Sequence, residues 1–552
     1  MAGTDRTSHY SARQRGIRIV AGAAMALGML SVLPPTSGPA ARADEVTASQ
    51  NTLRDGWDAS EPGLSPSVLT GGSFGQLFST PVNGQVYAQP VVAGSTLVVA
   101  TQNDYVYGLD AASGAVRWSM SLGTPWPTST ANCTDVTPSV GVMSTPVYDP
   151  SSGIVYLVAE VIPPGNDAYH PAFYLHALSA QTGAEQPGWP VQIQGAPVND
   201  PTRPFDPYSE WQRPGLLLMG GSVYAAFGSH CDYSPFVGYV AGVNTSTRSQ
   251  TMWSSDAGLT DSMGGIWQGG GGLMSDGTGR IFLATGNGVS PASGPGSSPP
   301  SELAESVVRL AVGSGGALSA QDFFSPTNAP ALDSTDRDFG SGGPVGLPYG
   351  TSAYPHLLVQ AGKDGRVFLL SRDSLGGRGQ GTNGTDNVLS VAGPYQGQWG
   401  HPAAFGDTAA VSTANSATAN DFVYYVGRND ALRALKFGVD SSGSPLLSDV
   451  ANSAGNFGFS SGSPVVTSNG TDPSSAVVWE VYTSAPGAAG TLEAYQAVPA
   501  SSCTAAAPCT LRELWSAPIG TASKFTIPAT DSGRVYVGTG DGHVLGFGSP
   551  DA

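Results

Sequence analysis

Short apolar runs alternate with polar, turn-forming segments along most of the chain, and residues 97–118 show this pattern most clearly. Three strand-like runs, 97–100, 105–109 and 115–118, are separated by the polar segments 102–104 and 111–114. The separators hold residues that favour turns, and Gly114 can adopt a positive φ without steric cost. The pattern predicts a meander of short antiparallel strands joined by tight turns.

The same pattern returns along the chain. Residues 360–371, 425–436 and 537–548 can each be placed over residues 99–110 without a gap. Each unit begins with a segment rich in glycine or aromatic residues, and these eight segments are 85–92, 141–148, 210–217, 264–273, 338–347, 398–405, 457–466 and 524–530. A repeat of about 60 residues indicates propeller blades, which usually need ~40–50 residues, with lengthened loops.

The two ends of the repeat region complement each other. The last unit holds only three predicted strands, whereas residues 74–81 predict one strand with no unit of its own. If the strand at 74–81 pairs with the last unit, no sheet edge stays open between the two ends of the repeat region. A solenoid, by contrast, would leave the strand at 74–81 unexplained. We therefore predict an all-β fold, a closed eight-bladed β-propeller of four-stranded antiparallel blades in which the N-terminal strand completes the last blade.

A secretory signal peptide is predicted for residues 1–43. Arg13, Arg15 and Arg18 precede an apolar run at 19–33, and Ala-Arg-Ala at 41–43 fits a small-x-small cleavage site. The run is short for a membrane-spanning helix, so a membrane anchor is the weaker interpretation. We expect a mature protein without an integral membrane segment that is secreted or extracytoplasmic, in the cell envelope.

Residues 44–73 are polar, contain glycine and proline, and show no periodicity. They predict a flexible N-terminal arm, whose removal should affect the propeller at 74–552 little. Only 12% of the 552 residues are charged, but 40% are hydrophobic and fall in strand-length runs, so disorder is not indicated. The net charge of −18 and the absence of a basic cluster beyond the N-terminus argue against nucleic-acid binding and favour a soluble monomer.

The four cysteines predict two disulfide bonds, because an even count in an exported protein usually means pairing. Cys503 and Cys509 bracket a small loop, and this pairing leaves Cys133 with Cys231, which would link adjacent repeats. A zinc site is the weaker alternative, since no C-x₂-C spacing is present.

Residues 108–118, with the sequence GLDAASGAVRW, resemble the repeat of the quinoprotein, or PQQ-like, β-propellers, which runs Ala-x-Asp-x-x-Thr-Gly-x-x-x-Trp. Gly108 stands in the alanine position and Ser113 in the threonine position. The third unit departs further, with Asn244 for the aspartate and Trp253 one position late. The resemblance covers about 74–552 and implies the propeller fold more firmly than an activity.

Some members of this family are dehydrogenases with pyrroloquinoline quinone (PQQ) and calcium, and others are scaffolds without a cofactor. This chain has neither the adjacent cysteine pair of many quinoprotein alcohol dehydrogenases nor a C-x-x-C-H haem motif. Asp333, Asp336 and Asp338 form the nearest approach to a metal cluster, but a solvated turn explains their spacing better. We therefore assign no catalytic or metal-binding residues. A ligand-binding or protein-interaction scaffold is favoured over a PQQ- and calcium-dependent dehydrogenase of alcohols or sugars, with a carbohydrate-binding propeller as a third class.

The candidate ligand-binding residues lie in the inner segments, because these segments line the channel of a propeller. They are Trp211, Arg213, Trp267, Gln268, Asp338, Trp399 and His401. Indoles can stack on a planar ligand and Arg213 can contact an anion, so the expected partners are a protein or a small planar or anionic ligand. The alternative is that the indoles pack between blades, as we expect for Trp118, and that His401 is structural.

Overall fold

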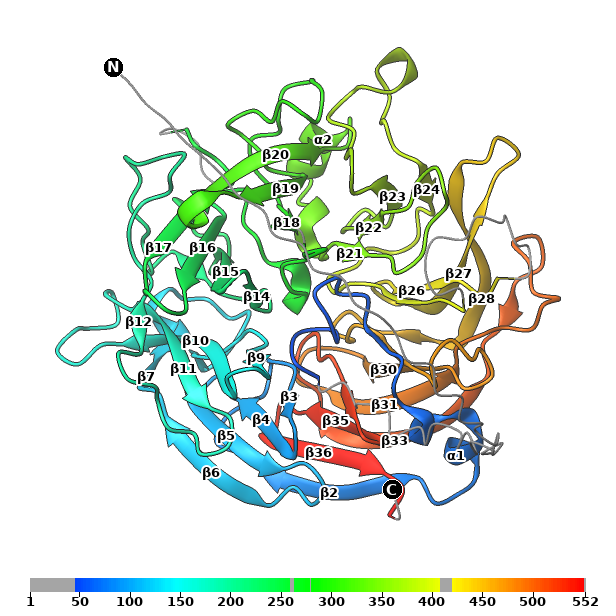
Figure 1. Ribbon diagram of the computed structural model, residues 1–552, viewed down its shortest axis with the longest axis horizontal. Coiled ribbons are helices and arrows are strands. Elements are labelled where there is room, and N and C mark those ends of the chain that lie inside the picture. The colour runs from blue at the N-terminus through cyan, green and yellow to red at the C-terminus, as the bar shows by residue number, and fades with distance from the viewer. Residues whose placement is uncertain (1–44, 259–262, 278, 408–418, 551–552) are drawn as a thin grey trace, which may run out of the picture. The chain divides into compact units, whose positions relative to one another are not determined.

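The computed structural model describes residues 45–258, 263–277, 279–407 and 419–550, all within one compact unit, residues 42–552. These residues form eight sheets that follow one another around a ring (Figure 1). The predicted eight-bladed β-propeller is confirmed. The predicted signal peptide lies outside the described residues.

Each blade begins at the channel and proceeds outward through antiparallel strands. The first blade comprises β3 (Val91–Ala93), β4 (Thr96–Ala100), β5 (Tyr105–Asp110) and β6 (Val116–Ser121). The second comprises β9 (Val147–Asp149), β10 (Ile154–Ile162), β11 (Ala172–Ser179) and β12 (Val191–Gln192), with β7 (Thr124–Pro127) and β8 (Ser139–Val140) at its edge. The third comprises β14 (Leu217–Met219), β15 (Ser222–Ser229), β16 (Tyr239–Asn244) and β17 (Gln250–Ser254), with β13 (Glu210–Trp211) beside β15. The fourth comprises β18 (Arg280–Ala284), β19 (Val307–Val312) and β20 (Leu318–Phe324), and a single bridge at Met274 takes the place of its inner strand.

The remaining blades complete the ring. The fifth comprises β21 (Val345–Gly346), β22 (Leu357–Ala361), β23 (Val367–Ser371) and β24 (Ser390–Ala392). The sixth comprises β25 (Ala403–Phe405), β26 (Phe422–Val426), β27 (Asp430–Val439) and β28 (Pro445–Phe457), and β32 (Cys509–Thr510) pairs parallel with β28 at its outer edge. The seventh comprises β29 (Val465–Thr467), β30 (Val477–Thr483), β31 (Ala489–Gln496) and β33 (Glu513–Thr521), and the eighth β34 (Ala529–Asp531), β35 (Arg534–Gly538) and β36 (His543–Gly548). Short helices lie between strands: α1 (Pro66–Thr70), α2 (Ala329–Asp333) and the 3₁₀ turns at Pro62–Leu64, Thr128–Thr130, Gln268–Gly270, Ser314–Gly316, Phe339–Ser341 and Thr382–Gly384.

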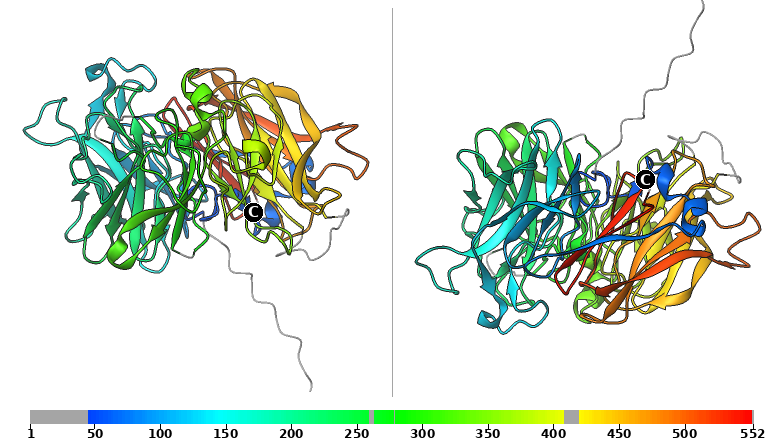
Figure 2. Two further views of the ribbon diagram at one scale, coloured as in Figure 1. Left: turned by 90° about the horizontal axis from the view of Figure 1, so that it is seen from above. Right: turned by 90° about the horizontal axis from the view of Figure 1, so that it is seen from below.

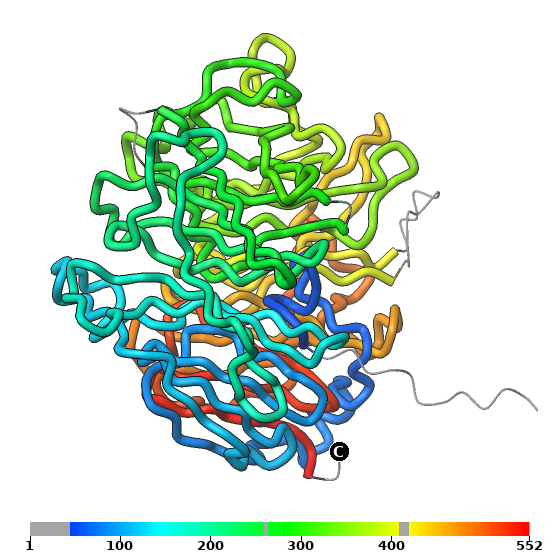
Figure 3. The backbone as a smooth tube through the Cα atoms, turned by 60° about the vertical axis from the view of Figure 1, so that its left-hand side comes forward, coloured from blue at the N-terminus to red at the C-terminus, as the bar shows by residue number. Residues whose placement is uncertain are grey.

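The ring is closed by strands from the two ends of the described chain. β2 (Gly75–Pro81) pairs antiparallel with β36, and Ser79 lies opposite Leu545. The blue and red segments therefore lie side by side (Figure 3). The predicted closure is confirmed, and the outer edge of β36 is covered rather than left open to pair with another chain.

Apolar side chains between neighbouring blades form the core, and Trp118 shows how the repeat sequence produces this packing. The indole Nε1 of Trp118 in the first blade donates a hydrogen bond to Ala180 O in the second blade, at 3.1 Å. A Cβ at Gly183 would lie 2.5 Å from the indole, so the glycine leaves the space that the ring fills. The tryptophan and the glycine of the repeat thus act across a blade interface, as expected for Trp118.

Residues 45–61 differ from the sequence expectation of a flexible arm. They run around the inside of the ring, visible as the dark blue segment in Figures 1 and 2. Arm carbonyls accept hydrogen bonds from six blades in chain order: Glu45 O from Val92 N, Val46 O from Tyr148 N, Thr52 O from Ser275 N, Leu53 O from Gly346 N, Asp55 O from Ala404 N and Gly56 O from Val466 N. Beyond Gly56, β1 (Trp57–Asp58) pairs with β29 of the seventh blade. The Glu61 carboxylate then accepts hydrogen bonds from Ser532 N and Gly533 N of the eighth blade, at 2.7 and 2.6 Å.

The physical reason for this arrangement is that inner strands have one unpaired edge. Their N–H groups face the channel, and burying them without partners would cost about 1–3 kcal/mol each. The arm supplies the acceptors through its own backbone. A segment bound in this way needs no hydrophobic periodicity, which is why the sequence pattern did not reveal it.

Both predicted disulfide bonds are present. Cys133–Cys231 joins the β7–β8 connection of the second blade to the β15–β16 connection of the third, and Cys503–Cys509 closes the small loop before β33. Such bonds are typical of proteins in an oxidising compartment. Within the described ranges, no helix has both the length and the apolar character needed to cross a membrane.

Candidate functional site

A cavity of about 630 Å³ lies where connections from different blades meet around the channel. Segments that lead into the inner strands supply much of its wall, and the turns β15–β16 and β22–β23 supply other parts. The lining residues used below are Tyr87, Asp135, Trp211, Arg213, Ser229, Cys231, Asp232, Trp267, Asp336, Asp338, Lys363, Trp399, Phe459, Lys524 and Phe525. Its size is within the usual range for small-molecule sites.

The structure brings together five of the predicted site residues, and Trp211, Arg213, Trp267, Asp338 and Trp399 all line the cavity. The other two, Gln268 and His401, are fully buried and lie outside the lining. Gln268 Oε1 accepts a hydrogen bond from Ala284 N at 3.0 Å, and its Nε2 donates to Gly272 O at 3.0 Å. Gln268 therefore supports the backbone around the cavity.

His401 connects the blades to the arm. Its Nε2 lies 2.6 Å from Ser49 Oγ, and its Nδ1 lies 2.9 Å from Pro402 O. Burial lowers the pKa of His401 to about 4, so the imidazole is neutral at neutral pH. Its contacts assign His401 a structural role rather than contact with a ligand in the cavity.

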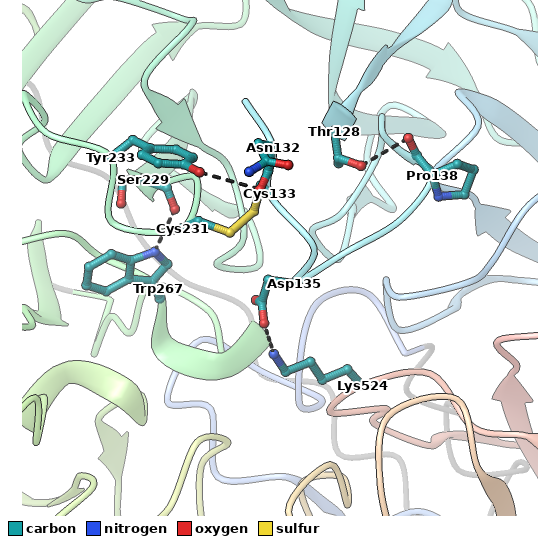
Figure 4. The surroundings of a disulfide bond; sticks show 10 residues. All are labelled: Thr128, Asn132, Cys133, Asp135, Pro138, Ser229, Cys231, Tyr233, Trp267 and Lys524. Carbon is teal, nitrogen blue, oxygen red and sulfur yellow. Dashed lines mark hydrogen bonds and ion pairs between the residues drawn. A yellow bond between two sulfur atoms is a disulfide. The ribbon is translucent and has the colours of Figure 1, made fainter. Parts of the chain in front are cut away.

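Two indoles offer partly exposed faces to the cavity and are held at their edges. Trp267 Nε1 donates a hydrogen bond to Ser229 O at 3.1 Å (Figure 4). The Trp267 ring also lies edge-on to the ring of Phe236, with 5.8 Å between the centroids. Trp399 lies edge-on to Phe459 at 4.8 Å. A Cβ at Gly269 would lie 1.1 Å from Trp399 O, so only glycine permits this close approach.

The charged groups of the cavity are mostly paired. Lys363 Nζ lies 2.7 Å from Asp336 Oδ1 and 2.5 Å from Asp338 Oδ2, and Lys524 Nζ lies 2.5 Å from Asp135 Oδ1 (Figure 4). Burial lowers the pKa of Lys363, but the charge of Asp338 and the hydrogen bonds outweigh it, so the net pKa is raised. Lys363 therefore remains a charged donor held between two carboxylates.

Arg213, which was expected to contact an anion, is a buried part of the cavity wall. Its guanidinium is buried and donates to Met143 O at 3.1 Å and to Lys524 O at 3.4 Å. Burial lowers its pKa to about 10, which still leaves the group protonated at neutral pH. These two carbonyls already accept hydrogen bonds from N–H groups of the guanidinium that an anion would need for bidentate binding.

Sequence reasoning missed Lys363, Lys524 and the aromatic pair Phe459 and Phe525. A signal for the lysines was present, because Lys363 and Lys524 are two of only three lysines in the chain and both stand in or beside predicted inner or turn segments. The phenylalanines gave no such signal, since a propeller core is rich in this residue type.

The residues of the cavity do not fit PQQ with calcium, the cofactor set that the family resemblance implies. Among the described residues no group of three or more His, Cys, Asp or Glu side chains could hold a metal ion. The Asp333 and Asp338 carboxylates accept hydrogen bonds from Gly288 N and Asn287 N, at 2.8 and 2.7 Å. PQQ carries three carboxylates, whereas within the cavity itself both lysines, Lys363 and Lys524, are already paired with aspartates; among the described residues, exposed arginines without an ion pair lie in an adjoining hollow.

Comparisons with known proteins agree with the fold. Residues 67–193 match the family model described as outer membrane protein assembly factor BamB. A quinohemoprotein alcohol dehydrogenase from Comamonas testosteroni is similar in structure, with a TM-score of 0.57 at 15% identity over 92% of this chain and 81% of that one. The quinohemoprotein alcohol dehydrogenase ADHIIG from Pseudomonas putida HK5 has a TM-score of 0.56 at 13% identity, with the same coverage of 92% and 81%.

A europium-containing methanol dehydrogenase has a TM-score of 0.51 at 13% identity, over 90% of this chain and 89% of that one. No curated protein matches the sequence significantly. At these identities the structural likeness shows the fold alone. Residues 67–193 are thus similar to this family model, and the chain has the β-propeller fold that these dehydrogenases also have.

Proposed function

We propose that this protein is an extracytoplasmic ligand-binding propeller whose site is the cavity at the channel. The observation that carries the proposal is the lining itself: partly exposed indoles on a rigid ring, beside paired ammonium and carboxylate groups. Such a wall combines apolar faces with directed hydrogen-bonding groups, which is the usual composition of a small-molecule site. The two disulfide bonds support the extracytoplasmic location.

The arm supports a binding role further, because it fills the channel next to the cavity. Ser49 is fully buried against His401. The arm does not line the cavity itself, but through His401 it fixes the backbone behind the cavity wall. A rigid, preformed site reduces the entropy lost on binding.

A quinoprotein dehydrogenase is the second candidate, favoured by the structural likeness of the fold. The misfit of the charged groups argues against it. Adding PQQ and Ca²⁺ to the purified protein, with alcohols, sugars and an artificial electron acceptor, separates the two. We expect no dye reduction and no saturable quenching of tryptophan fluorescence by PQQ, and turnover would overturn the binding proposal in favour of the enzyme.

The positive test is a thermal-shift screen of small molecules on the wild-type protein and on Trp267→Ala. Ligands of the cavity should raise the melting temperature of the wild type and lose this effect in the variant. Trp189→Ala is the matched control, because that indole packs between the second and third blades, away from the cavity. Ligands that protect both variants equally would show that binding lies elsewhere.

A further inference from the structure

A second hollow of about 400 Å³ adjoins the cavity, and we call it the side hollow. It shares Asp336, Lys363 and Trp399 with the cavity and is lined in addition by Arg337, Asp364, Tyr395 and Arg428. Because the shared residues form a common wall, a ligand longer than one ring can occupy both spaces. The two spaces differ in their charges.

The side hollow contains cations without carboxylate partners. Arg337 and Arg428 are exposed and form no ion pair within the described part of the chain. Arg428 is nevertheless positioned, because its guanidinium lies 5.1 Å from the ring of Phe459 and 5.9 Å from that of Trp399. In a chain with a net charge of −18, two unpaired arginines beside a cavity favour an anionic group there.

The cavity, by contrast, contains polar atoms that suit an uncharged, hydroxyl-bearing ligand. Ser229 is 1% exposed, and its Oγ has no hydrogen-bond partner among the described residues. The Nε1 of Trp211 likewise is buried and has no partner there. A buried hydroxyl and a buried N–H without partners are costly, and both line this wall. Both atoms are covered by neighbouring atoms, so a ligand hydroxyl supplies the missing bond only with a small displacement of the lining side chains, while the Lys–Asp pairs stay intact.

The arrangement of the indoles argues for sugar rings rather than a flat aromatic ligand. Trp267 and Trp399 each contact a phenylalanine edge-on, and among the described residues neither is in stacked contact with another indole. A flat aromatic molecule is held best between two parallel faces, whereas a sugar ring needs one aromatic face and several hydrogen bonds.

We propose that the cavity and the side hollow form one site for an acidic oligosaccharide. Sugar rings lie against Trp267 and Trp399 with hydroxyls toward Ser229 and Trp211, and a carboxylate or sulfate group is bound by Arg428 and Arg337. The inference rests on the proposed function and specifies its ligand class. It also moves the anion contact from the buried Arg213 to the exposed arginines.

The test is isothermal titration of the purified protein with trigalacturonic acid, a sulfated trisaccharide and the neutral galactotriose. At least one acidic trisaccharide should bind more than tenfold more tightly than galactotriose, and this preference should shrink as salt concentration rises. The two acidic probes distinguish a carboxylate from a sulfate as the bound group.

Arg428→Gln should weaken binding of the acidic ligand at least tenfold more than it weakens binding of galactotriose, because only the acidic ligand loses a charged partner. Arg512→Gln is the matched control, because Arg512 is also exposed but lies outside both hollows. Equal binding of neutral and acidic sugars, an unchanged affinity in Arg428→Gln, or no binding of any trisaccharide would each overturn the inference. An aromatic anion such as naphthalenesulfonate that binds through Trp267 would overturn it too, while the proposed function would stand. If the thermal-shift screen also found no ligand sensitive to Trp267→Ala, both proposals would fail.

Discussion

The arm and the cavity both lie in the channel, but they differ in how far their polar groups are paired. In the arm, backbone carbonyls and the Glu61 carboxylate pair with N–H groups of successive blades. In the cavity, a serine hydroxyl and an indole N–H have no partner within the described ranges, and the adjoining arginines have no carboxylate partner there. Buried polar atoms without partners also occur elsewhere among the described residues, for example in Glu210 and Glu480, but those of Ser229 and Trp211 belong to residues that line the cavity. The wall where pairing stops is where a ligand would supply the partners.

The largest expected effect is that of removing the arm. Deleting residues 45–61 would leave inner-strand N–H groups of at least six blades without acceptors, and we expect a loss of more than ~5 kcal/mol in the free energy of unfolding. Urea denaturation measures this, or insolubility of the product shows it directly. A synthetic peptide of residues 45–61 added during refolding should restore part of the stability. A truncated protein as stable as the full chain would show that the arm is dispensable, as the sequence alone suggested.

A single substitution in the arm should reproduce much of this loss. The Arg54 guanidinium donates to Leu273 O, Ala48 O and Leu216 O at 2.8–2.9 Å, and it is 1% exposed. Arg54→Met keeps most of the volume but leaves these carbonyls unpaired, so we expect about 3–4 kcal/mol of destabilisation. The matched variant Arg213→Met loses fewer carbonyl contacts and should cost about half as much. An equal loss of stability in Arg54→Met and Arg213→Met would show that the arm arginine is no more important for folding than the cavity arginine.

Two tryptophans test the cavity side of the comparison. Trp118→Ala should cost about 2–4 kcal/mol of stability, because the indole packs across a blade interface against Gly183. Trp267→Ala should instead weaken ligand binding by about 1–3 kcal/mol, the range for loss of an aromatic anchor. Melting curves and binding titrations on both variants measure the loss of stability and the loss of affinity separately. If Trp267→Ala lost as much stability as Trp118→Ala with binding intact, only a packing role would remain for Trp267.

The sequence predicted what periodicity and pairing rules govern. The repeat around Asp110 and Trp118 indicated the blades, the strand at 74–81 indicated the closure, and the cysteine count gave the disulfides. The position of the arm inside the ring was not predicted, because backbone hydrogen bonds do not depend on the pattern of apolar and polar side chains. Gln268 and His401 were chosen from the inner segments by residue type, but burial decides which of those residues reach the cavity. That depends on backbone direction, such as the left-handed φ of 50° at Gln268, which spacing alone does not encode.

The smallest effect concerns the pH dependence of the arm. Burial raises the pKa of Asp55 to about 6, against 3.8 for an ordinary aspartate, although hydrogen bonds from Trp57 N and Asn51 Nδ2 oppose the shift. The folded protein thus binds this proton more tightly than the unfolded chain, so the contribution to stability is fully present below about pH 4 and is lost as pH rises through 6. Asp55→Asn keeps an accepting oxygen and cannot ionise. We expect the variant to gain about 1–2 kcal/mol over the wild type at pH 7.5 and nothing at pH 4.

Asp110 provides the opposite case on the outside of the ring. The hydrogen bond from the Ser113 hydroxyl lowers the pKa of Asp110 to about 2, with burial opposing and the Ser113 N–H and Arg117 adding to it. Its contribution is therefore present above about pH 4 and lost as pH falls through 2, and Asp110→Asn should lower stability at pH 7.5 rather than raise it. Urea denaturation of the wild type and both variants at pH 4 and 7.5 gives the two differences. Opposite signs at pH 7.5 are expected because one carboxylate is enclosed by the arm and the other faces solvent among donors. A stability of Asp55→Asn that followed the wild type at both pH values would mean that this carboxyl titrates as an exposed group, and the account of a closely packed arm would then be wrong.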